Sequence, residues 1–400
     1  MSAILFAISF LFIQIIYSKD FSLYYNDAEL GTRFTTFLVG SPPKRQSFRT
    51  TLFYPYNYVI STQSTIENGF IPINKSETIT IRNQTFDTQL VQNRLCMNLG
   101  VDCIEDFFFH KIETVPEFRI YDTISLSKAS YHKILSKLKS NNLIEYEKFS
   151  LIPYGKQNGK IHFGDIHKSD LQNKQKYKCT SSSKRNEWGC DLNEIIFDNS
   201  QTLGEQKVYV NNITSVFEAL NNKFYVPYDF FMFLSTNVFD VFVKNKKCKL
   251  IEQNEEKHFE CGCGDLDDFP QTKFVFDGVV FNVGVKFMFQ QQMIGYRCDH
   301  LFFYNKDNEK WIIGTRFLQN YITEFDCEKG DIGFYSDNYL STIWKYRMNY
   351  DGSKINTENI CVGIASSCFI GIVLLCLFKK LIGYDIESIK DVESNTENDE

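Results

Sequence analysis

The chain has 400 residues, 43% of them hydrophobic and 16% aromatic, and its formal net charge is −6. This length suits two lobes around a large core, and the many Phe (38) and Tyr (22) residues favour β-structure. The mildly acidic balance and the lack of a basic stripe argue against nucleic acid as a partner.

The N-terminal end begins with an apolar run, Ile4–Tyr17, which has the length of a signal peptide. We expect residues 1–18 to form this signal, with cleavage after Ser18, although the run is not preceded by a positive charge. The bulk of the chain would then enter the secretory pathway.

Short apolar or alternating segments of strand length follow, separated by turns. Examples are FTTFLVG, TITI, KIHFG, KVYV, FVFDGVVFNV and WIIG. The polar run SSSKRNE, residues 181–187, is typical of a boundary between lobes. The sequence therefore predicts an N-terminal β lobe over residues 19–180 and a C-terminal β lobe over residues 181–345.

Two helices are predicted within these lobes. One has apolar residues at i, i+3, i+4 and i+7, which would form a single buried face: Tyr131, Ile134, Leu135 and Leu138. The other covers Tyr228–Val238, directly after a proline.

The C-terminal end contains a second apolar run, Ile360–Phe378. It is uncharged for 19 residues, about enough to cross a ~30 Å hydrocarbon core, and two lysines follow it at once. We expect a stalk at residues 346–359, a transmembrane helix at 360–378 and an acidic cytoplasmic tail at 379–400. A glycolipid-anchor signal would instead end in its hydrophobic tail. These features predict a type I single-pass membrane protein of the cell surface or the secretory or endolysosomal pathway.

Nine of the twelve cysteines lie in the predicted ectodomain, where an oxidising compartment favours disulfide bonds. Because nine is odd, we expect one thiol to be free or paired with another chain. The disulfide candidates are Cys96, Cys103, Cys179, Cys190, Cys248, Cys261, Cys263 and Cys298. The CGCG run at 261–264 fits disulfide cysteines better than metal ligands, and neither a metal nor a cofactor is predicted. Candidate glycosylation sites are Asn74, Asn83 and Asn212.

The segment WIIGTRFLQNYITEFDCEKGDIGFY, residues 311–335, resembles the strand, short helix and hairpin that end pepsin-like aspartic proteases. Thr315 stands where that family usually has an aspartate. Other blocks resemble the family in the same order: VGSPPKRQSF (39–48), YDTISLS (121–127) and FSLIPYGKQNGKIHFGD (149–165). The resemblance covers roughly residues 30–340. It implies a mainly β, bilobal fold with a deep inter-lobe cleft for peptides and a disulfide in the region Cys248–Cys298; the C-terminal transmembrane helix is predicted separately, from the apolar run.

The chemistry of this family uses two aspartates that share one proton, each within a D-[TS]-G-[TS] loop from one lobe. Both loops are altered here. The first aspartate position falls at Phe53, or at Leu52 if the register slips, and the chain has no acid between Leu30 and Ile66. The second falls at Glu218, where the loop reads EALN. The cleft and loop candidates are Leu52, Phe53, Tyr54, Glu218, Ala219 and Asn221.

The flap hairpin that covers the cleft in this family is also expected to be altered. Residues 61–78 contain no tyrosine, and they look too short for a full flap if TITIRNQTF, residues 78–86, is the strand that follows it. Water would then be poorly excluded from the site.

We therefore expect a membrane-anchored relative of pepsin-like proteases that keeps the fold, lacks an intact catalytic pair and binds a peptide or protein in its cleft. Glu218 would then be a solvated or hydrogen-bonded residue without a chemical role. The alternative is an active aspartic endopeptidase, in which Glu218 works with a second acid such as Asp122 or Asp165. A third interpretation is a structural surface protein whose cleft is filled by Phe and Tyr.

Overall fold

The computed structural model describes most of the chain between the two apolar ends, and all described residues fall within one compact unit, Met1–Ser341. The described ranges are 21–27, 33–60, 70–81, 84–97, 102–113, 122–130, 133–154, 158–179, 182, 186–199, 204–219, 221–253, 255–292, 296–306 and 310–336.

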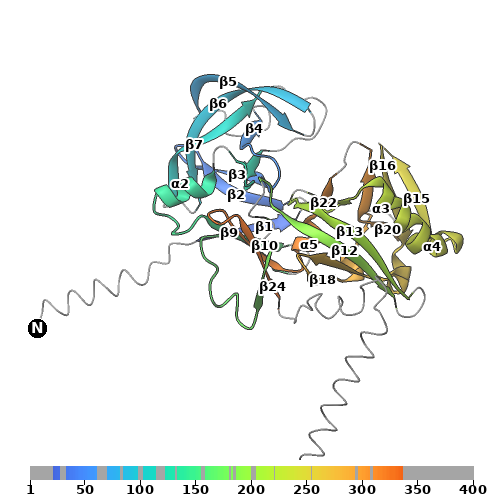
Figure 1. Cartoon of the computed structure of the whole chain (residues 1–400). Helices are drawn as coiled ribbons and strands as arrows, with labels where there is room; N and C mark the ends of the chain where they lie inside the picture. The colour runs from blue at the N-terminus through green and yellow to red at the C-terminus, as the bar shows by residue number, and fades with distance from the viewer. Residues whose placement is uncertain are drawn as a thin grey trace, which may run out of the picture. The chain divides into compact units, whose positions relative to one another are not determined.

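The described residues of the first half of the chain form a β-structure that includes the helix α2 (Figure 1). Its elements are β1 (Phe21–Asp27), β2 (Arg33–Val39), β3 (Lys44–Thr51), β4 (Tyr58–Ile60), β5 (Ile71–Ile81), β6 (Gln84–Cys96), β7 (Cys103–Ile112), β8 (Thr123–Ser125), α2 (Ile134–Ser140), β9 (Lys148–Tyr154), β10 (Asn158–Phe163) and β11 (Gln175–Cys179).

The second half is also mainly β and adds one longer helical segment. It contains β12 (Gly189–Asn199), β13 (Gly204–Phe217), β14 (Phe224–Tyr225), α3 (Tyr228–Phe233), the π-helix η2 (Leu234–Phe239), α4 (Asp240–Lys244), β15 (Cys248–Gln253), β16 (Glu256–Gly262), the 3-10 helix η3 (Cys263–Asp268), β17 (Gln271–Phe276), β18 (Val279–Val283), the 3-10 helix η4 (Val285–Phe287), β19 (Phe289–Gln291), β20 (Arg297–His300), β21 (Phe302–Asn305), β22 (Trp311–Ile313), α5 (Thr315–Leu318), β23 (Ile322–Asp326) and β24 (Asp331–Ser336).

The same strand arrangement occurs once in each half. In the first, β3 pairs in parallel with β8, and β4 pairs in parallel with β7. In the second, β13 pairs in parallel with β22, and β14 pairs in parallel with β21. Each half thus presents one loop between two short parallel pairings: residues 52–57 after β3 and residues 218–223 after β13.

The two halves are joined by a shared sheet. The last hairpin, β23–β24, returns to the first half, where β23 pairs with β9 and β24 pairs with β11. These strands belong to a 13-stranded sheet in the order β11-β24-β23-β9-β10-β1-β2-β3-β8-β4-β7-β6-β5, beside an 11-stranded sheet of the second half. The β23–β24 hairpin therefore completes the sheet on which the N-terminal strands lie (Figure 1).

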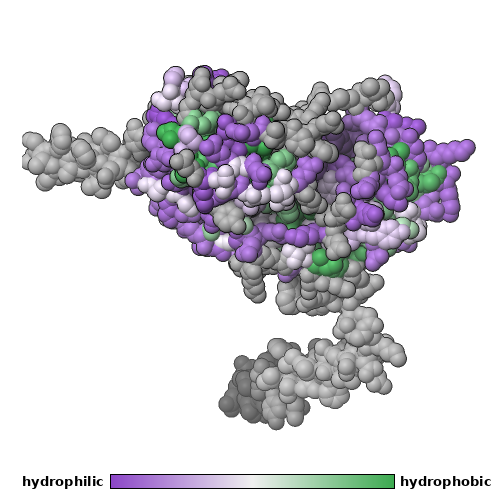
Figure 2. All heavy atoms as spheres, turned by 90° about the horizontal axis from the view of Figure 1, so that it is seen from above, coloured by the Kyte–Doolittle hydropathy of each residue, from purple (hydrophilic) through white to green (hydrophobic). Residues whose placement is uncertain are grey.

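The core is built largely from phenylalanine rings, which explains the aromatic composition. Phe217 is fully buried, and its ring centroid lies 5.7 Å from those of Phe276, Phe317 and Phe334. Such rings bury a large apolar area and pack edge to face. On the face seen from above, hydrophilic side chains dominate, and hydrophobic residues occur in small separate groups (Figure 2).

Both predicted helices exist, with different bounds. α2 begins at Ile134 and buries Ile134, Leu135 and Leu138, as the periodicity predicts, whereas Tyr131 lies outside the described residues. The second helical segment begins at Tyr228 but continues through η2 and α4 to Lys244, six residues beyond the predicted end. It continues because the later turns also bury apolar side chains: Phe239, for example, stacks on Phe259 of the 11-stranded sheet.

Neither predicted membrane segment falls within the described residues. Residues 1–18, Ile360–Phe378 and the tail all lie outside them. Within the described ranges, no helix is both long and apolar enough to span a bilayer.

All eight candidate cysteines form disulfide bonds. The pairs are Cys96–Cys103, Cys179–Cys190, Cys248–Cys261 and Cys263–Cys298. Cys327 is the free cysteine among the described residues. Burial raises the pKa of the Cys327 thiol to about 12, so it is protonated at neutral pH.

We expect the Cys263–Cys298 bond to contribute more stability than the Cys96–Cys103 bond. The first closes a sequence separation of 35 residues and the second one of 7. Because the entropy removed from the unfolded chain grows with the logarithm of loop length, the difference should be about 1 kcal/mol. Urea denaturation of the two paired Cys→Ala variants measures it. Equal losses in the free energy of unfolding would contradict the expectation.

A buried histidine makes stability depend on pH. The ring of His300 lies 4.8 Å from that of Phe239 and 4.9 Å from that of Phe289. Burial among these rings, with a smaller effect from His258, lowers the pKa of His300 from 6.5 to about 3. The folded state therefore holds His300 neutral, and protonation of the unfolded chain below pH 6.5 favours unfolding.

Between pH 7 and pH 5, this single group should lower the free energy of unfolding by about 2 kcal/mol. Its contribution is fully present above pH 6.5 and is lost progressively as the pH falls toward 3. In a His300→Leu variant of similar volume, the drop in stability from pH 7 to pH 5 should be smaller by that amount. Denaturant unfolding at both pH values gives the comparison, and identical slopes with pH would contradict it.

Candidate functional site

The loops after β3 and β13 meet at one buried contact. The hydroxyl oxygen Oγ1 of Thr51 lies 3.4 Å from Oε1 and 3.5 Å from Oε2 of Glu218. Thr51 is the last residue of β3, and Glu218 directly follows the last residue of β13. Both side chains are buried, with exposed fractions of 0% and 7%. The two positions come from opposite halves of the chain, which are joined through the pairing of β23 with β9 and of β24 with β11.

The hydrogen bonds fix the direction of this contact. Thr51 Oγ1 accepts hydrogen bonds from the backbone N–H of Phe53 at 3.1 Å and of Tyr54 at 3.2 Å. Since the hydroxyl has a single proton, that proton is directed to the carboxylate of Glu218. The backbone N–H of Ala219 also donates to Glu218 Oε1 at 2.7 Å. Among the residues that the structure describes, the group of the first loop that contacts Glu218 is thus a hydroxyl donor and not a carboxylate.

The structure places the expected residues Leu52 and Phe53 beside this contact, and Thr51 makes the contact itself. Leu52 is buried in the main core. Phe53 is half-buried, with its ring 5.2 Å from that of Tyr54 and 5.8 Å from the ammonium of Lys310. Counting along the family pattern missed Thr51. No local pattern in the sequence marks Thr51, because its place in the site depends on the pairing of β3 with β8.

The two proposed second acids are engaged by other groups. The carboxylate of Asp122 accepts hydrogen bonds from the backbone N–H of Ile60 at 2.8 Å and from the amide of Gln46. Burial raises the pKa of Asp122, while these hydrogen bonds act to lower it. Asp122 also lies three residues from Ser125, the partner of Thr51 in β8, which is about 10 Å along a strand.

Asp165, the other proposed acid, pairs with Lys148. Its Oδ1 lies 2.8 Å from the Lys148 Nζ, and its side chain is 54% exposed. A carboxylate that is exposed and paired with a lysine differs from the buried second carboxylate that would share a proton with Glu218.

The second loop is shaped by Gly314. A Cβ at this position would lie 2.5–2.7 Å from the carbonyl oxygens of Asn221, Asn222 and Lys223. Thr315 closes the loop from the same side: its N–H donates to the Asn221 carbonyl at 2.8 Å, and its hydroxyl donates to Asn222 Oδ1 at 2.6 Å. The loop backbone therefore rests directly on the Gly314 backbone.

Two further loop candidates do not contact the Glu218 carboxylate through their side chains. The Asn221 amide accepts from the Lys223 N–H at 3.0 Å and donates to the Tyr225 hydroxyl at 3.3 Å, on the side of β14. Ala219 is buried, and it contributes only its backbone N–H to Glu218.

The expectation of a short flap is wrong for this stretch of chain. β5 and β6 form a long hairpin of 11 and 13 residues. TITI is the end of its first strand rather than the strand that follows the flap, and the tip, residues 82–83, lies outside the described residues. The hairpin contains no tyrosine.

The glycosylation candidates fall in or beside strands. Asn74 lies in β5 and Asn212 in β13, but their side chains are outside the described part of the chain. Asn83 lies outside the described residues altogether. Among the described residues, no group of three His, Cys, Asp or Glu side chains is arranged to hold a metal ion.

Two comparisons with known proteins agree with this geometry. The fold has the mainly β, bilobal form of an aspartic protease: it is similar to the crystal structure of aspartic proteinase from Irpex lacteus, with a TM-score of 0.61. That likeness has 12% sequence identity and covers 79% of this chain and 97% of the other, so it shows the fold alone. The family model of the eukaryotic aspartyl protease matches residues 75–336, and the chain belongs to that family. The comparison with curated proteins found no match.

Proposed function

We propose that this chain is a non-catalytic member of the eukaryotic aspartyl protease family that binds a peptide or protein segment between its two site loops. The contact between Thr51 and Glu218 carries this proposal. The reaction of aspartic proteases needs two carboxylates that share one proton, one to activate water and one to polarise the scissile carbonyl.

A threonine hydroxyl cannot replace the missing carboxylate. It neither ionises in the range where carboxylates titrate nor exchanges the roles of acid and base with a partner. The hydroxyl oxygen of Thr51 also already accepts two backbone hydrogen bonds, which occupy it as an acceptor. Members of a catalytic set act together, so the loss of one removes most of the rate.

The first loop offers binding surface in place of chemistry. Residues Phe53, Tyr54 and Tyr56 are all half-buried, so this aromatic loop keeps some solvent-exposed surface. Aromatic rings supply large contact area at low cost in conformational entropy. The ammonium of Lys310 lies 5.8 Å from the centroid of the Phe53 ring, so this ring already contacts a cation of the protein.

The proposal includes the cellular setting that the sequence predicts. A signal peptide at residues 1–18 and one transmembrane helix at 360–378 would give a type I membrane protein of the cell surface or the secretory or endolysosomal pathway. The four disulfide bonds support an oxidising compartment. Asn74, Asn83 and Asn212 would be open to glycosylation there.

The alternative function is an active aspartic endopeptidase that uses Glu218 with an unidentified second acid. The geometry favours it less, because Asp122 and Asp165 are held by other partners. The purely structural role is favoured less because Phe53, Tyr54 and Tyr56 of the first loop are only half-buried.

Peptide enrichment tests the binding function. Immobilised full-length protein is incubated with a random decapeptide library, and the retained peptides are sequenced and checked for cleavage. We expect a defined subset to be retained intact, and retention to fall in a Phe53→Ala variant. Tyr296→Ala is the matched control, because that ring is 87% exposed and lies outside the loop. No enrichment, or equal enrichment with Phe53→Ala, would overturn the proposal.

A further inference from the structure

Strand β15 lies at an edge of the 11-stranded sheet. Among the described residues it pairs with β16 alone, in an antiparallel register that runs unbroken from Cys248 opposite Cys261 to Gln253 opposite Glu256. It lies on the outer side of the second half of the chain, beside α4 (Figure 1). An edge strand presents a row of backbone groups with which a further strand can pair.

The register shows which backbone groups of β15 face outward. The N–H of Gly262 donates to the carbonyl of Lys247 at 3.0 Å, and the Cα atoms of Cys248 and Cys261 are 4.1 Å apart. This cysteine pair is therefore a non-hydrogen-bonded pair, whose N–H and C=O groups point away from the neighbouring strand. Because the direction alternates along a strand, the outward groups belong to Cys248, Leu250 and Glu252.

Leu250 is an exposed apolar residue at the centre of this edge. Its side chain is 46% exposed, although the residue opposite it in β16, Phe259, is buried. The polar neighbours of Leu250 form ion pairs with β16, Lys249 at 2.9 Å and Glu252 at 3.0 Å. A second strand at this edge would therefore cover Leu250 and remove its apolar area from water.

The two turns that bound β15 carry opposite charges. Lys246 precedes the strand and Glu255 follows it, and both residues are exposed. Within the described ranges, neither side chain takes part in an ion pair. A strand of the same sequence that runs antiparallel to β15 would bring the lysine of each copy to the glutamate of the other, whereas a parallel strand would bring like charges together.

We propose that β15 pairs with β15 of a second copy of this chain, antiparallel and about a two-fold axis at Leu250. In this arrangement the two Leu250 side chains face each other, and Cys248 of each copy lies opposite Glu252 of the other. The outward groups then form about six hydrogen bonds between the copies. Both copies use the same surface, as a two-fold interface requires.

The charges of β15 select this register. Directly opposed side chains point to the same face of a sheet, so a two-fold axis must fall on a residue and not between two residues. An axis at Lys249 or at Glu252 would oppose like charges, which is destabilising. An axis at Ile251 would place Leu250 opposite Glu252. The axis at Leu250 opposes two apolar side chains and uses all three outward residues.

Sedimentation velocity of the full-length protein in a mild detergent tests the association. We expect a monomer–dimer equilibrium with a dissociation constant in the micromolar range, because an interface of one strand from each copy is small. Leu250→Lys should raise this constant at least about tenfold, since it places two ammonium groups directly opposite each other.

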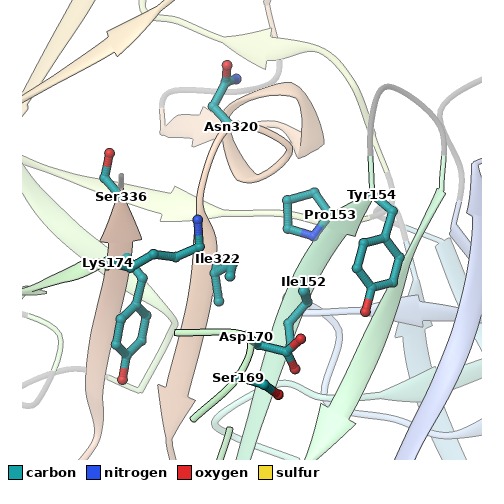
Figure 3. A pocket seen from close by; sticks show the side chains of 10 residues that line it. Ile152, Pro153, Tyr154, Ser169, Asp170, Lys174, Asn320, Ile322 and Ser336 are labelled. Carbon is teal, nitrogen blue, oxygen red and sulfur yellow. The ribbon is translucent and has the colours of Figure 1, made fainter. Parts of the chain in front are cut away.

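Two exposed positions on the other sheet supply matched controls. Ile71 is 62% exposed and lies in β5, the edge strand of the 13-stranded sheet. Tyr154 is 46% exposed, as Leu250 is, and it lines a cavity on that sheet (Figure 3). Ile71→Lys and Tyr154→Lys should both leave the dissociation constant unchanged.

Exchange of the turn charges tests the pairing of the two turns. Lys246→Glu should weaken the dimer, because each copy would then bring an acid to Glu255 of the other. The double variant that combines Lys246→Glu with Glu255→Lys should restore it. A double variant that associates no better than Lys246→Glu alone would contradict the antiparallel arrangement.

Cysteine cross-linking tests the register. Opposed residues of a hydrogen-bonded pair have Cα atoms about 5.5 Å apart, so Leu250→Cys should form a covalent dimer on mild oxidation. Glu252→Cys should not, because the two Glu252 positions are about 13 Å apart along the strands. Cross-linking of Glu252→Cys in place of Leu250→Cys would overturn the register. A chain that stays monomeric up to about 100 μM, or a dimer that Leu250→Lys does not weaken, would overturn the proposal.

Discussion

Replacing Gly314 by alanine is expected to destabilise the fold by about 3 kcal/mol or more. The new Cβ would lie within 2.7 Å of three carbonyl oxygens, those of Asn221, Asn222 and Lys223. These atoms belong to the backbone of the second site loop, so no flexible side chain can move aside. Overpacking of this kind commonly costs about 1–3 kcal/mol, and contact with several backbone atoms places this case at or above the upper end.

Urea denaturation of Gly314→Ala measures the effect, with Gly264→Ala as the matched control. A Cβ at Gly264 would meet no heavy atom within 4 Å, so this variant should stay within about 0.5 kcal/mol of the parent protein. Similar stabilities of the two variants would show that the loop does not rest on Gly314 as described.

Trp188→Ala is expected to cost about 3–5 kcal/mol, the usual range for a large aromatic residue removed from a core. Trp188 is fully buried, and its ring lies 6.1 Å from Phe149 in β9 and 5.2 Å from Phe325 in β23. Its indole N–H donates to the Leu126 carbonyl at 2.8 Å. Trp188 thus connects the start of the second half to the strands of the first.

Two comparison variants separate packing from hydrogen bonding at this position. Trp188→Phe keeps most of the ring but leaves the Leu126 carbonyl without the indole donor, so we expect an intermediate loss of about 1–3 kcal/mol. Tyr296→Ala removes an exposed ring and should change the free energy of unfolding little. A Trp188→Ala variant as stable as Tyr296→Ala would contradict the account of the junction.

Much of the fold could be predicted from the sequence because residues 311–335 closely resemble the end of pepsin-like aspartic proteases. Residues 311–335 form β22, α5, β23 and β24 in the order that the resemblance implies. The face of α2 follows from its apolar periodicity. The pairing of the cysteines could not be predicted, because it depends on register: Cys248 faces Cys261, and Cys96 faces Cys103, across antiparallel strands.

The length of the second helical segment depends on contacts that are distant in sequence. Phe239 stacks on Phe259 and Phe242 stacks on Phe269, each pair with ring centroids 4.0 Å apart. The predicted end, Val238, falls inside the π-helical turn η2, where the buried face differs from that of a regular α-helix.

The candidate site was predicted in part. The family pattern located Glu218, which the structure places at the meeting point of the two loops. Counting forward in the first loop gave Phe53 or Leu52, whereas the pairing of Thr51 with Ser125 turns the Thr51 side chain toward Glu218. That register is set by the parallel strand β8, which no local pattern in the loop reveals.

The most direct test of the central claim is proteolysis by the full-length protein on a mixed peptide library from pH 3 to pH 7. Glu218→Ala serves as the matched control, and each reaction is run with and without an inhibitor that mimics the transition state of aspartic proteases. The account predicts no cleavage above that of Glu218→Ala at any pH. Cleavage that the inhibitor blocks and that Glu218→Ala abolishes would contradict it, because Glu218 would then work with a second acid in place of Thr51.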